Sequence, residues 1–340
     1  MTLVYGAFDD RVYRWTLTGE SEVDRRRIDG HRYLSLAVDE SDPDRLVFGT
    51  VDAGLLYTAD GGETTTAAEG VSYEAAEGVS YDRVSALAWS PHDSDVVYAG
   101  TEPSHLYRSS DGGETWTAVG AIQDLPSEPE WSFPPRPHTH HVRWIEVDPF
   151  DPDRLLVGIE AGALLVTEDG GETWIERPEG SRRDIHSLTA HPEREGRVFA
   201  AAGDGFAQSD DGGLTWTHPQ DGLDHRYCWS VVTNPGDPDM VCVSSARSAS
   251  RAHRPERAES YVYRKRGDEP WERLDDRGLA MGEGTVRAEL ATGDEPDLVY
   301  AMTNRGLFRS TDVGDRWRRV DVEWPDALER QVPRGLVVTG

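Results

Sequence analysis

The sequence has almost no lysine and a large excess of acidic residues. Lys265 is the only lysine among 35 basic residues, whereas 63 residues are acidic, so the formal net charge is −28. Dense surface carboxylates stay hydrated at high salt, where their mutual repulsion is screened, and we therefore expect a halophilic source. The same charge repels a nucleic acid backbone, so no nucleic-acid partner is expected.

Cysteine and long apolar runs are also scarce. Cys228 and Cys242 are too few for a disulfide framework, and both lie in apolar, strand-like runs that favour buried, reduced thiols. No apolar run of about 18 residues is present to span a membrane. The N-terminus has no basic segment followed by an apolar stretch. These absences predict a cytoplasmic protein without a membrane partner.

One short pattern, by contrast, recurs along the chain. Its clearest copy is 109–116, Ser-Ser-Asp-Gly-Gly-Glu-Thr-Trp. The aspartate can accept hydrogen bonds from nearby backbone N–H groups, glycine supplies a positive φ, and tryptophan can pack beneath the turn. We therefore expect the aspartates of this pattern to be structural. They are Asp60, Asp111, Asp169, Asp211 and Asp312.

The spacing of the copies predicts the architecture of the chain. Successive aspartates are 51, 58, 42 and 101 residues apart, and the last interval corresponds to two periods with one eroded copy. A repeat near 50 residues is typical of β-propellers. Short β-branched and aromatic runs, divided by Gly, Pro and Asp clusters, indicate four strands in each repeat. In the third repeat they are expected at 84–89, 96–100, 105–109 and from Trp116 onward.

We predict an all-β fold: one seven-bladed β-propeller of four-stranded antiparallel blades over 1–340. The N-terminus has three strands (near 3–6, 12–16 and 26) but no innermost strand, whereas 335–338 is a strand without a hairpin partner. The two ends should share one blade, which closes the ring and leaves no open edge. The predicted blades are 1–30 plus 332–340, 31–81, 82–120, 138–180, 182–222, 225–277 and 284–324.

The repeated pattern resembles the Asp-box, or BNR repeat, of sialidase-type β-propellers. That superfamily includes xyloglucan-active glycoside hydrolases, sortilin-type receptors and a photosystem II assembly factor. The stretch 135–144, Pro-Arg-Pro-His-Thr-His-His-Val-Arg-Trp, looks like one in microbial proteins labelled as glycosyl hydrolases. The resemblance implies the fold rather than one activity. The chain lacks the Arg-Ile-Pro signature of sialidases, and it has room for one propeller where xyloglucan-active enzymes use two.

Three segments interrupt the repeat. They are 67–81, which contains Ala-Ala-Glu-Gly-Val-Ser-Tyr twice, the Pro-rich stretch 121–143, and 246–260. In a four-stranded blade, the connections between blades and those between the second and third strands lie on one face, whereas the Asp-box hairpins lie on the other. We therefore expect all three segments on the face opposite the Asp-boxes. Loops on a rigid scaffold commonly carry function, so this face is the candidate binding face.

The histidine-rich end of the second segment gives one candidate site. In an extended segment alternate residues share a side, so His138 and His140 are expected to point together. Glu102 and Glu160 end equivalent strands of the two blades that this segment connects. The four side chains can bind a divalent metal, or Glu102 and Glu160 can act as a catalytic acid and base. The alternative is a polar loop without chemistry. No other cofactor is predicted.

A second candidate site follows from aligning the innermost strands. The alignment places Arg143, His186 and Arg287 around the channel mouth, where they can donate hydrogen bonds to an anionic or hydroxyl-rich ligand. Trp229 occupies the same position in its strand and could stack on a sugar. The alternative places these side chains between the blades. Asp184 and Asp204 reach the same face but carry little weight among 63 acidic residues. With the neighbouring His141, the candidate ligand-binding residues are His138, His140, His141, Arg143, His186, Trp229 and Arg287.

These patterns predict a ligand-binding propeller with a small-molecule or glycan site, anionic or carbohydrate-like, at the channel mouth opposite the Asp-boxes. One alternative is a glycosidase-like hydrolase that uses the pair Glu102 and Glu160. Another is a protein-interaction scaffold whose basic loop, 246–257, contacts a protein partner. The hydrolase requires two carboxylates at catalytic separation in the channel mouth. The interaction scaffold requires an exposed apolar patch beside the loop and no closed pocket.

Overall fold

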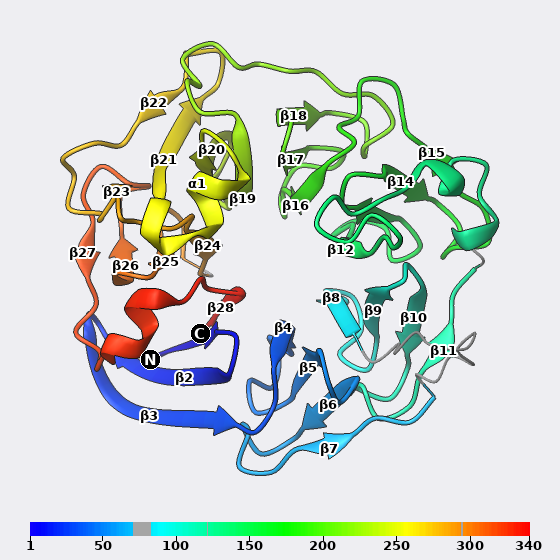
Figure 1. The fold of residues 1–340 in the computed structure, drawn as a ribbon, viewed down its shortest axis with the longest axis horizontal. Helices are drawn as coiled ribbons and strands as arrows, with labels where there is room; N and C mark the ends of the chain where they lie inside the picture. Colours follow the sequence, from blue (N-terminus) through cyan, green and yellow to red (C-terminus); the bar gives the residue numbers. More distant parts are fainter. Residues whose placement is uncertain (71–82, 121, 294) are drawn as a thin grey trace.

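The structure, a computed structural model, describes residues 1–70, 83–120, 122–293 and 295–340. Seven sheets are arranged radially around a central channel (Figure 1), which confirms the predicted all-β, seven-bladed propeller. The innermost strands follow one another around the channel. They are β28 (Gly335–Thr339), β4 (Tyr33–Val38), β8 (Arg83–Trp89), β12 (Val142–Val147), β16 (Ile185–Ala190), β19 (Tyr227–Asn234) and β24 (Glu289–Thr292).

The two ends of the chain close the ring in one blade. The C-terminal strand β28 pairs antiparallel with β1 (Thr2–Ala7), and the sheet continues through β2 (Arg11–Thr18) to β3 (Ser21–Asp29). The register joins Leu3 to Thr339 and Ala7 to Gly335. Figure 1 shows both termini side by side at this blade. The predicted closure is confirmed.

The remaining strands complete six further blades. The second strands are β5 (Leu46–Thr50), β9 (Val97–Glu102), β13 (Leu155–Ile159), β17 (Val198–Ala202), β20 (Asp237–Ala246) and β25 (Val299–Thr303). The third strands are β6 (Leu55–Thr58), β10 (Leu106–Ser109), β14 (Ala163–Thr167), β18 (Gly205–Ser209), β21 (Glu259–Arg266) and β26 (Gly306–Ser310). The outer strands are β7 (Thr66–Ala67), β11 (Thr117–Ala118), β15 (Ile175–Glu176), β22 (Glu272–Arg273) and β27 (Arg318–Arg319).

Two blades depart from the four-stranded plan. In the fifth blade the outer strand is reduced to a single bridge between Gln208 and Thr217. In the sixth, the short strand β23 (Gly282–Glu283) also pairs with β21, so this sheet has five strands. The extra strand extends the sheet beside the loop that follows β20.

The blades pack closely because small residues lie where neighbouring sheets meet. A Cβ atom added to Gly100 would lie 2.3 Å from Cγ1 of Val142, the first residue of the next innermost strand. Gly158 meets Ile185 in the same way, at 2.5 Å. Any larger side chain would push the adjacent blade away, because protein interiors are close-packed. Both cysteines are buried and unpaired, as expected, and burial raises the pKa of each thiol to about 12.

Each Asp-box forms the local turn that its sequence predicts. Asp111 accepts hydrogen bonds from the backbone N–H of Thr115 at 2.9 Å and from the hydroxyl of Ser109 at 2.7 Å. Gly113 has a φ of 99°, and the indole of Trp116 donates to its carbonyl oxygen at 2.9 Å. The other box aspartates accept equivalent bonds, namely Asp60, Asp169, Asp211 and Asp312.

The boxes and the inserted loops within 122–143 and 246–260 lie on opposite faces of the disc. The N–H of Gly112 donates to the carbonyl oxygen of Asp95, which places this box beside the turn between the first and second strands of its blade. Connections between blades emerge at the other end of each sheet. The inserted loops there contain η1 (Ile122–Asp124), η2 (Glu128–Glu130), α1 (Ala249–His253) and η3 (Pro255–Arg257). Of the predicted insertion 67–81, residues 71–81 lie outside the described residues.

The only other helical element in the described chain is η4 (Asp326–Arg330), which precedes β28. No helix among the described residues has the length and hydropathy needed to cross a membrane.

Candidate functional site

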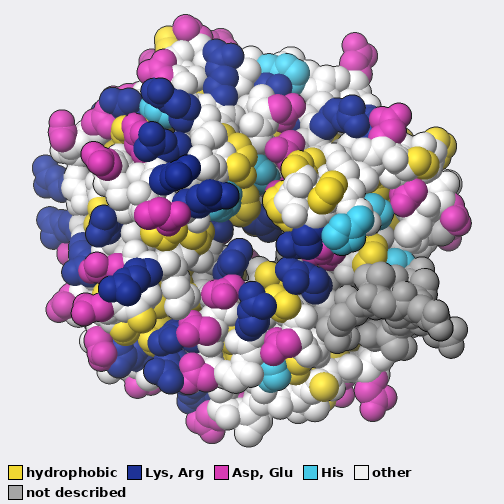
Figure 2. All heavy atoms as spheres, in the orientation of Figure 1, with side chains coloured by type: hydrophobic (Ala, Val, Ile, Leu, Met, Phe, Trp, Pro, Cys, Tyr) yellow, Lys and Arg dark blue, Asp and Glu magenta, His cyan; other side chains and the backbone are white. Residues whose placement is uncertain are grey.

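A cavity of about 720 Å³ opens at the channel mouth on the face of the inserted loops. Its walls come from the loops between blades, the loop containing α1 and the first residues of the innermost strands. Figure 2 shows Lys and Arg side chains gathered around the central opening. Seven arginines line the cavity: Arg32, Arg83, Arg136, Arg143, Arg254, Arg287 and Arg334. The lining carboxylates number four, namely Asp9, Glu102, Glu160 and Asp184.

The cavity is therefore locally cationic in a chain whose formal net charge is −28. Some of this charge is neutralised by ion pairs within the wall. Arg334 pairs with Asp9 at 3.1 Å, and Arg32 lies 3.8 Å from the same carboxylate. Arg254 is exposed and makes no ion pair among the described residues. Guanidinium groups therefore outnumber carboxylates in the lining at this end of the channel.

Glu102 is clamped by two arginines at one side of the cavity. Arg136 donates to both carboxylate oxygens, at 2.7 and 2.6 Å, and Nε of Arg83 lies 3.0 Å from Oε2. Burial alone would raise the pKa of Glu102, but Arg136 and Arg83 hold that pKa below its usual value. Glu102 is thus an ionised carboxylate with both oxygens engaged.

Glu160 is held by a histidine and a more distant arginine. Nε2 of His141 lies 3.0 Å from Oε2 of Glu160, and Nε of Arg143 lies 3.8 Å from the same oxygen. The ring of Phe133 packs edge-on against His141, at 4.7 Å between centroids. Burial opposes ionisation of Glu160, but His141 and the nearby cations lower its pKa to about 2. Glu160 also remains ionised.

Trp229 lies between arginines in the cavity wall. The guanidinium carbons of Arg143 and Arg287 lie 4.6 and 4.1 Å from its ring centroids, and only 7% of the residue is exposed. Its indole N–H donates to Oε1 of Glu289 at 3.1 Å. Arg287 donates to the same oxygen at 2.5 Å and to the carbonyl of Pro333 at 2.6 Å. Burial lowers the pKa of Arg287 to about 10.

His186 lies behind the wall, next to Trp229. Its Nδ1 is 2.6 Å from the carbonyl oxygen of Cys228, and its Nε2 is 3.8 Å from Oδ1 of Asp184. The imidazole packs against the rings of Tyr227 and Trp229, with centroids 4.8 and 4.6 Å away. Asp184, which sequence reasoning gave little weight, lines the cavity. Burial raises its pKa, against the attraction of His186.

The histidine segment differs from the expectation in one respect: His138 and His140 do not join Glu102 and Glu160. His140 contacts Glu128 at 3.1 Å and Ser104 at 2.9 Å, and His138 is exposed. The predicted alternation fails because 133–139 forms a closed turn instead of an extended segment. The N–H of Thr139 donates to the carbonyl oxygen of Arg136, and the N–H of Phe133 donates to the carbonyl oxygen of Thr139. Of the candidate residues, those lining the cavity are Glu102, Glu160, His141, Arg143, Trp229 and Arg287.

Several lining residues were not singled out from the sequence. Tyr227 contacts Nε2 of His253 through its hydroxyl, at 3.0 Å, and α1 brings His253 over Trp229, with centroids 4.3 Å apart. Burial, together with Arg287 and other nearby cations, holds the pKa of His253 well below its usual value. Arg136 lies within the distinctive stretch 135–144, which was the one sequence signal for its position.

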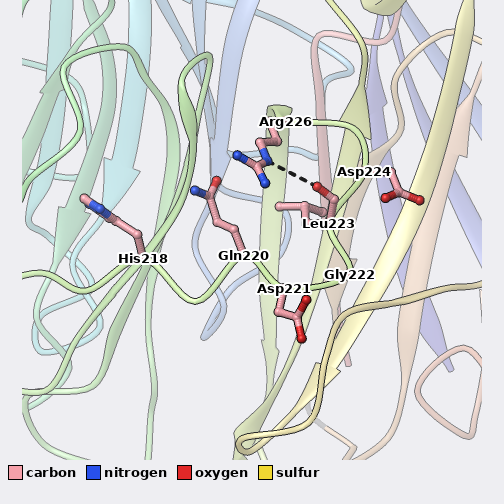
Figure 3. Close-up of a pocket in the computed structure, with 7 residues that line it drawn as sticks. All are labelled: His218, Gln220, Asp221, Gly222, Leu223, Asp224 and Arg226. Atoms are coloured by element: carbon pink, nitrogen blue, oxygen red, sulfur yellow. Dashed lines mark hydrogen bonds between the residues drawn. The ribbon is translucent and has the colours of Figure 1, made fainter.

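A second hollow, beside the loop between the fifth and sixth blades, has a volume of about 550 Å³ (Figure 3). Arg226 donates to the carbonyl of Leu223 at 3.4 Å, and His218 donates to the carbonyl of Gly180 at 2.7 Å. His218 and Asp224 lie at opposite sides of the view in Figure 3, with Gln220 and Arg226 between them. The channel mouth is the better candidate.

Comparison with solved structures identifies propellers of similar shape. An ancestral GH74 enzyme superposes with a TM-score of 0.64 at 14% identity, over 96% of this chain and 42% of that one. YCF48 bound to D1 peptide gives 0.58 at 17% identity, over 86% of this chain and 82% of that one. YCF48 from Cyanidioschyzon merolae gives 0.58 at 20% identity, over 86% and 87%.

The chain is a seven-bladed propeller similar to GH74 and YCF48 structures. At these identities the likeness shows the fold and not the activity. The chain covers less than half the length of the ancestral GH74 enzyme. No family model and no curated protein sequence matches the chain.

Proposed function

We propose that this propeller binds a small anionic ligand, carrying a carboxylate, phosphate or sulfate group, in the cavity at the channel mouth. The observation that carries this proposal is the excess of arginine over carboxylate in the cavity of a strongly acidic protein. Arginine is the residue best suited to bidentate recognition of such groups. Pockets with a few convergent polar groups are common binding sites.

Arg143 is the best placed of these arginines to contact a ligand. Among the described residues it makes no hydrogen bond, and its ion pair with Glu160 is long, 3.8 Å. Arg136 already donates to both carboxylate oxygens of Glu102, and Arg287 to Glu289 and to the carbonyl of Pro333. The terminal nitrogens of Arg143 are therefore available to an anion that enters the cavity.

The geometry favours recognition of charge over stacking on a neutral sugar. Trp229 is almost fully buried, and two guanidinium groups already lie close to its ring. A sugar would have to displace one of them to stack on the indole. An acidic carbohydrate remains within the proposed ligand class because its carboxylate can pair with Arg143.

The hydrolytic alternative is weaker for the pair Glu102 and Glu160. A glycosidase needs one carboxylic acid that keeps its proton until it donates it to the leaving group. The pKa of each of these carboxyls is lowered by its cationic neighbours, so neither supplies the proton. For the scaffold alternative, YCF48 has been solved with D1 peptide, but the loop 246–257 offers no extended apolar surface here.

The test is a titration calorimetry panel in low chloride. It compares phosphate, sulfate, citrate and glucuronate with neutral glucose. We expect at least one anion to bind, with an affinity that falls as salt rises, and Arg143→Ala to weaken it by about tenfold or more. Arg183→Ala, an exposed arginine outside the cavity, is the matched control. Equal binding by the two variants, or binding of glucose alone, would contradict the proposal.

A further inference from the structure

We propose that Glu160, Asp184 and His186 form a binding site for a first-row transition-metal dication in the wall of the channel mouth. One carboxylate oxygen from each acid and one imidazole nitrogen lie within 4.8 Å of one another. The site is a different set from the one expected on the histidine-rich loop, with which it shares only Glu160. It does not depend on anion binding in the cavity.

The imidazole of His186 is prepared for a metal by its backbone contact. Because Nδ1 lies 2.6 Å from the carbonyl oxygen of Cys228, Nδ1 carries a proton, and Nε2 is the ring nitrogen left to coordinate a metal in the neutral imidazole. That Nε2 is buried and has no hydrogen-bond partner among the described residues. A buried acceptor without a partner costs free energy, which a coordinated cation would offset. Histidine ligands commonly have their other ring nitrogen fixed in this way.

The two carboxylates are also oriented by contacts outside the cluster. Oδ1 of Asp184 accepts the N–H of Ala161 at 2.9 Å, and Oε2 of Glu160 lies 3.0 Å from His141. Gly203 leaves the room that Asp184 occupies, because a Cβ atom there would lie 1.9 Å from Oδ2. Each acid therefore keeps an oxygen for a further partner while its position is fixed. Such outer contacts support metal affinity by limiting ligand motion.

The charges around the cluster leave Asp184 without an arginine or lysine partner among the described residues. Within the described chain no arginine or lysine nitrogen lies within 4.0 Å of its carboxylate, and the only ion pair recorded for it is the long one with His186. Glu160 faces His141 and, at 3.8 Å, Arg143. A dication placed among the three ligand atoms would balance two carboxylates that are mostly shielded from water.

The ligand chemistry selects the class of metal. One imidazole with two carboxylates suits Zn²⁺, Mn²⁺ or Fe²⁺, whereas Ca²⁺ and Mg²⁺ prefer all-oxygen sites. Glu160 and Asp184 line the cavity and His186 lies behind them, so the remaining coordination positions would face the cavity. Three protein ligands with an open position is the arrangement of metal sites that also bind a water or a ligand.

The test measures metal binding directly on the full chain after EDTA treatment and removal of the chelator. Equilibrium dialysis should show one Zn²⁺ or Mn²⁺ bound per chain, and Ca²⁺ bound more weakly. Asp184→Asn should weaken Zn²⁺ binding roughly tenfold or more. Asp204→Asn removes the same charge from an exposed neighbour, paired at 3.7 Å with Arg182, and should leave Zn²⁺ binding unchanged. Equal weakening by both variants would overturn the proposal.

A spectroscopic readout identifies the nitrogen ligand. Electron spin echo envelope modulation of the Mn²⁺-loaded protein should show coupling to one imidazole ¹⁴N, and His186→Ala should abolish it. Circular dichroism and thermal melting of the variant confirm that it is folded; if it is not, Gly203→Ala, which displaces Asp184, replaces it in the dialysis test. Arg143→Ala should retain metal binding, which separates this inference from the anion site. Absence of nitrogen coupling in the unmodified chain would contradict it.

Discussion

The guanidinium carbon of Arg287 lies 4.1 Å from the centroid of the Trp229 ring, and both side chains donate to the same oxygen of Glu289. Trp229 and Arg287 line the cavity at the channel mouth, and Glu289 lies behind them. The three side chains are fixed by one another and by the carbonyl of Pro333, which belongs to the segment leading into β28. Arg287 therefore connects the cavity wall to the blade that closes the ring.

Arg287→Ala is expected to destabilise the protein strongly. It leaves Glu289 buried without its ion-pair partner, and loss of one member of a buried pair commonly costs about 3–5 kcal/mol. Urea unfolding followed by tryptophan fluorescence measures the loss. The double variant Arg287→Met with Glu289→Gln removes both charges and should lose less than the single variant. A single variant within about 0.5 kcal/mol of the unmodified chain would contradict the assigned role.

Asp111→Asn is expected to weaken the third-blade turn in a pH-dependent way. Burial raises the pKa of Asp111, but the hydrogen bonds from Thr115 and Ser109 together outweigh burial and lower that pKa overall. The folded pKa lies below the unfolded value near 4, so the charged side chain stabilises the fold above that pH. This contribution is lost as pH falls through the folded pKa.

The cost of Asp111→Asn should therefore be largest near neutral pH, about 1 kcal/mol because the turn is largely exposed. At a pH below the folded pKa of Asp111 the two proteins should converge in stability. Chemical denaturation at a series of pH values measures both limits. Asp151→Asn, in an exposed turn outside the Asp-boxes, is a matched control. A cost that does not change with pH would argue against the charged hydrogen bonds.

The protein is expected to become more stable as salt increases. With a formal net charge of −28, the acidic side chains repel one another and destabilise the folded state. Raising KCl from about 0.1 M to 1 M shortens the Debye length from about 10 Å to about 3 Å, which screens this repulsion. Exposed ion pairs such as that of Arg25 with Glu323 weaken over the same range, but each contributes little. The melting temperature should rise in KCl. A melting temperature that falls or stays constant would contradict this prediction.

Most of the fold could be predicted from the sequence because the repeat and its turns depend on short local sequence patterns. The spacing of the box aspartates gave the repeat, and the unpaired segment 335–338 indicated closure with 3–6, now seen as β28 on β1. The loss of the outer strand in the fifth blade could not be predicted. A two-residue outer strand forms only where the neighbouring third strand continues to pair with it, and the sequence pattern does not determine this. In this blade a single bridge at Gln208 is all that remains.

The candidate site was predicted only in part, for a physical reason. Glu102 and Glu160 follow from strand register, which fixes the face and the end of each blade. Whether His140 contacts Glu102 and Glu160 depends on how the long loop folds. In the structure His140 contacts Glu128 of the same loop instead. The cluster of Glu160, Asp184 and His186 joins two neighbouring blades across space. Sequence spacing alone does not indicate that these three side chains lie close together.

The most direct test of the account is to find an anion in the cavity. Crystals of the protein soaked in selenate, a tetrahedral dianion with a strong anomalous signal, should give an anomalous peak at the channel mouth within hydrogen-bonding distance of Arg143. The peak should be absent in Arg143→Ala and retained in Arg183→Ala. Selenate bound only at the outer surface, with an empty channel mouth in the unmodified protein, would contradict the central claim.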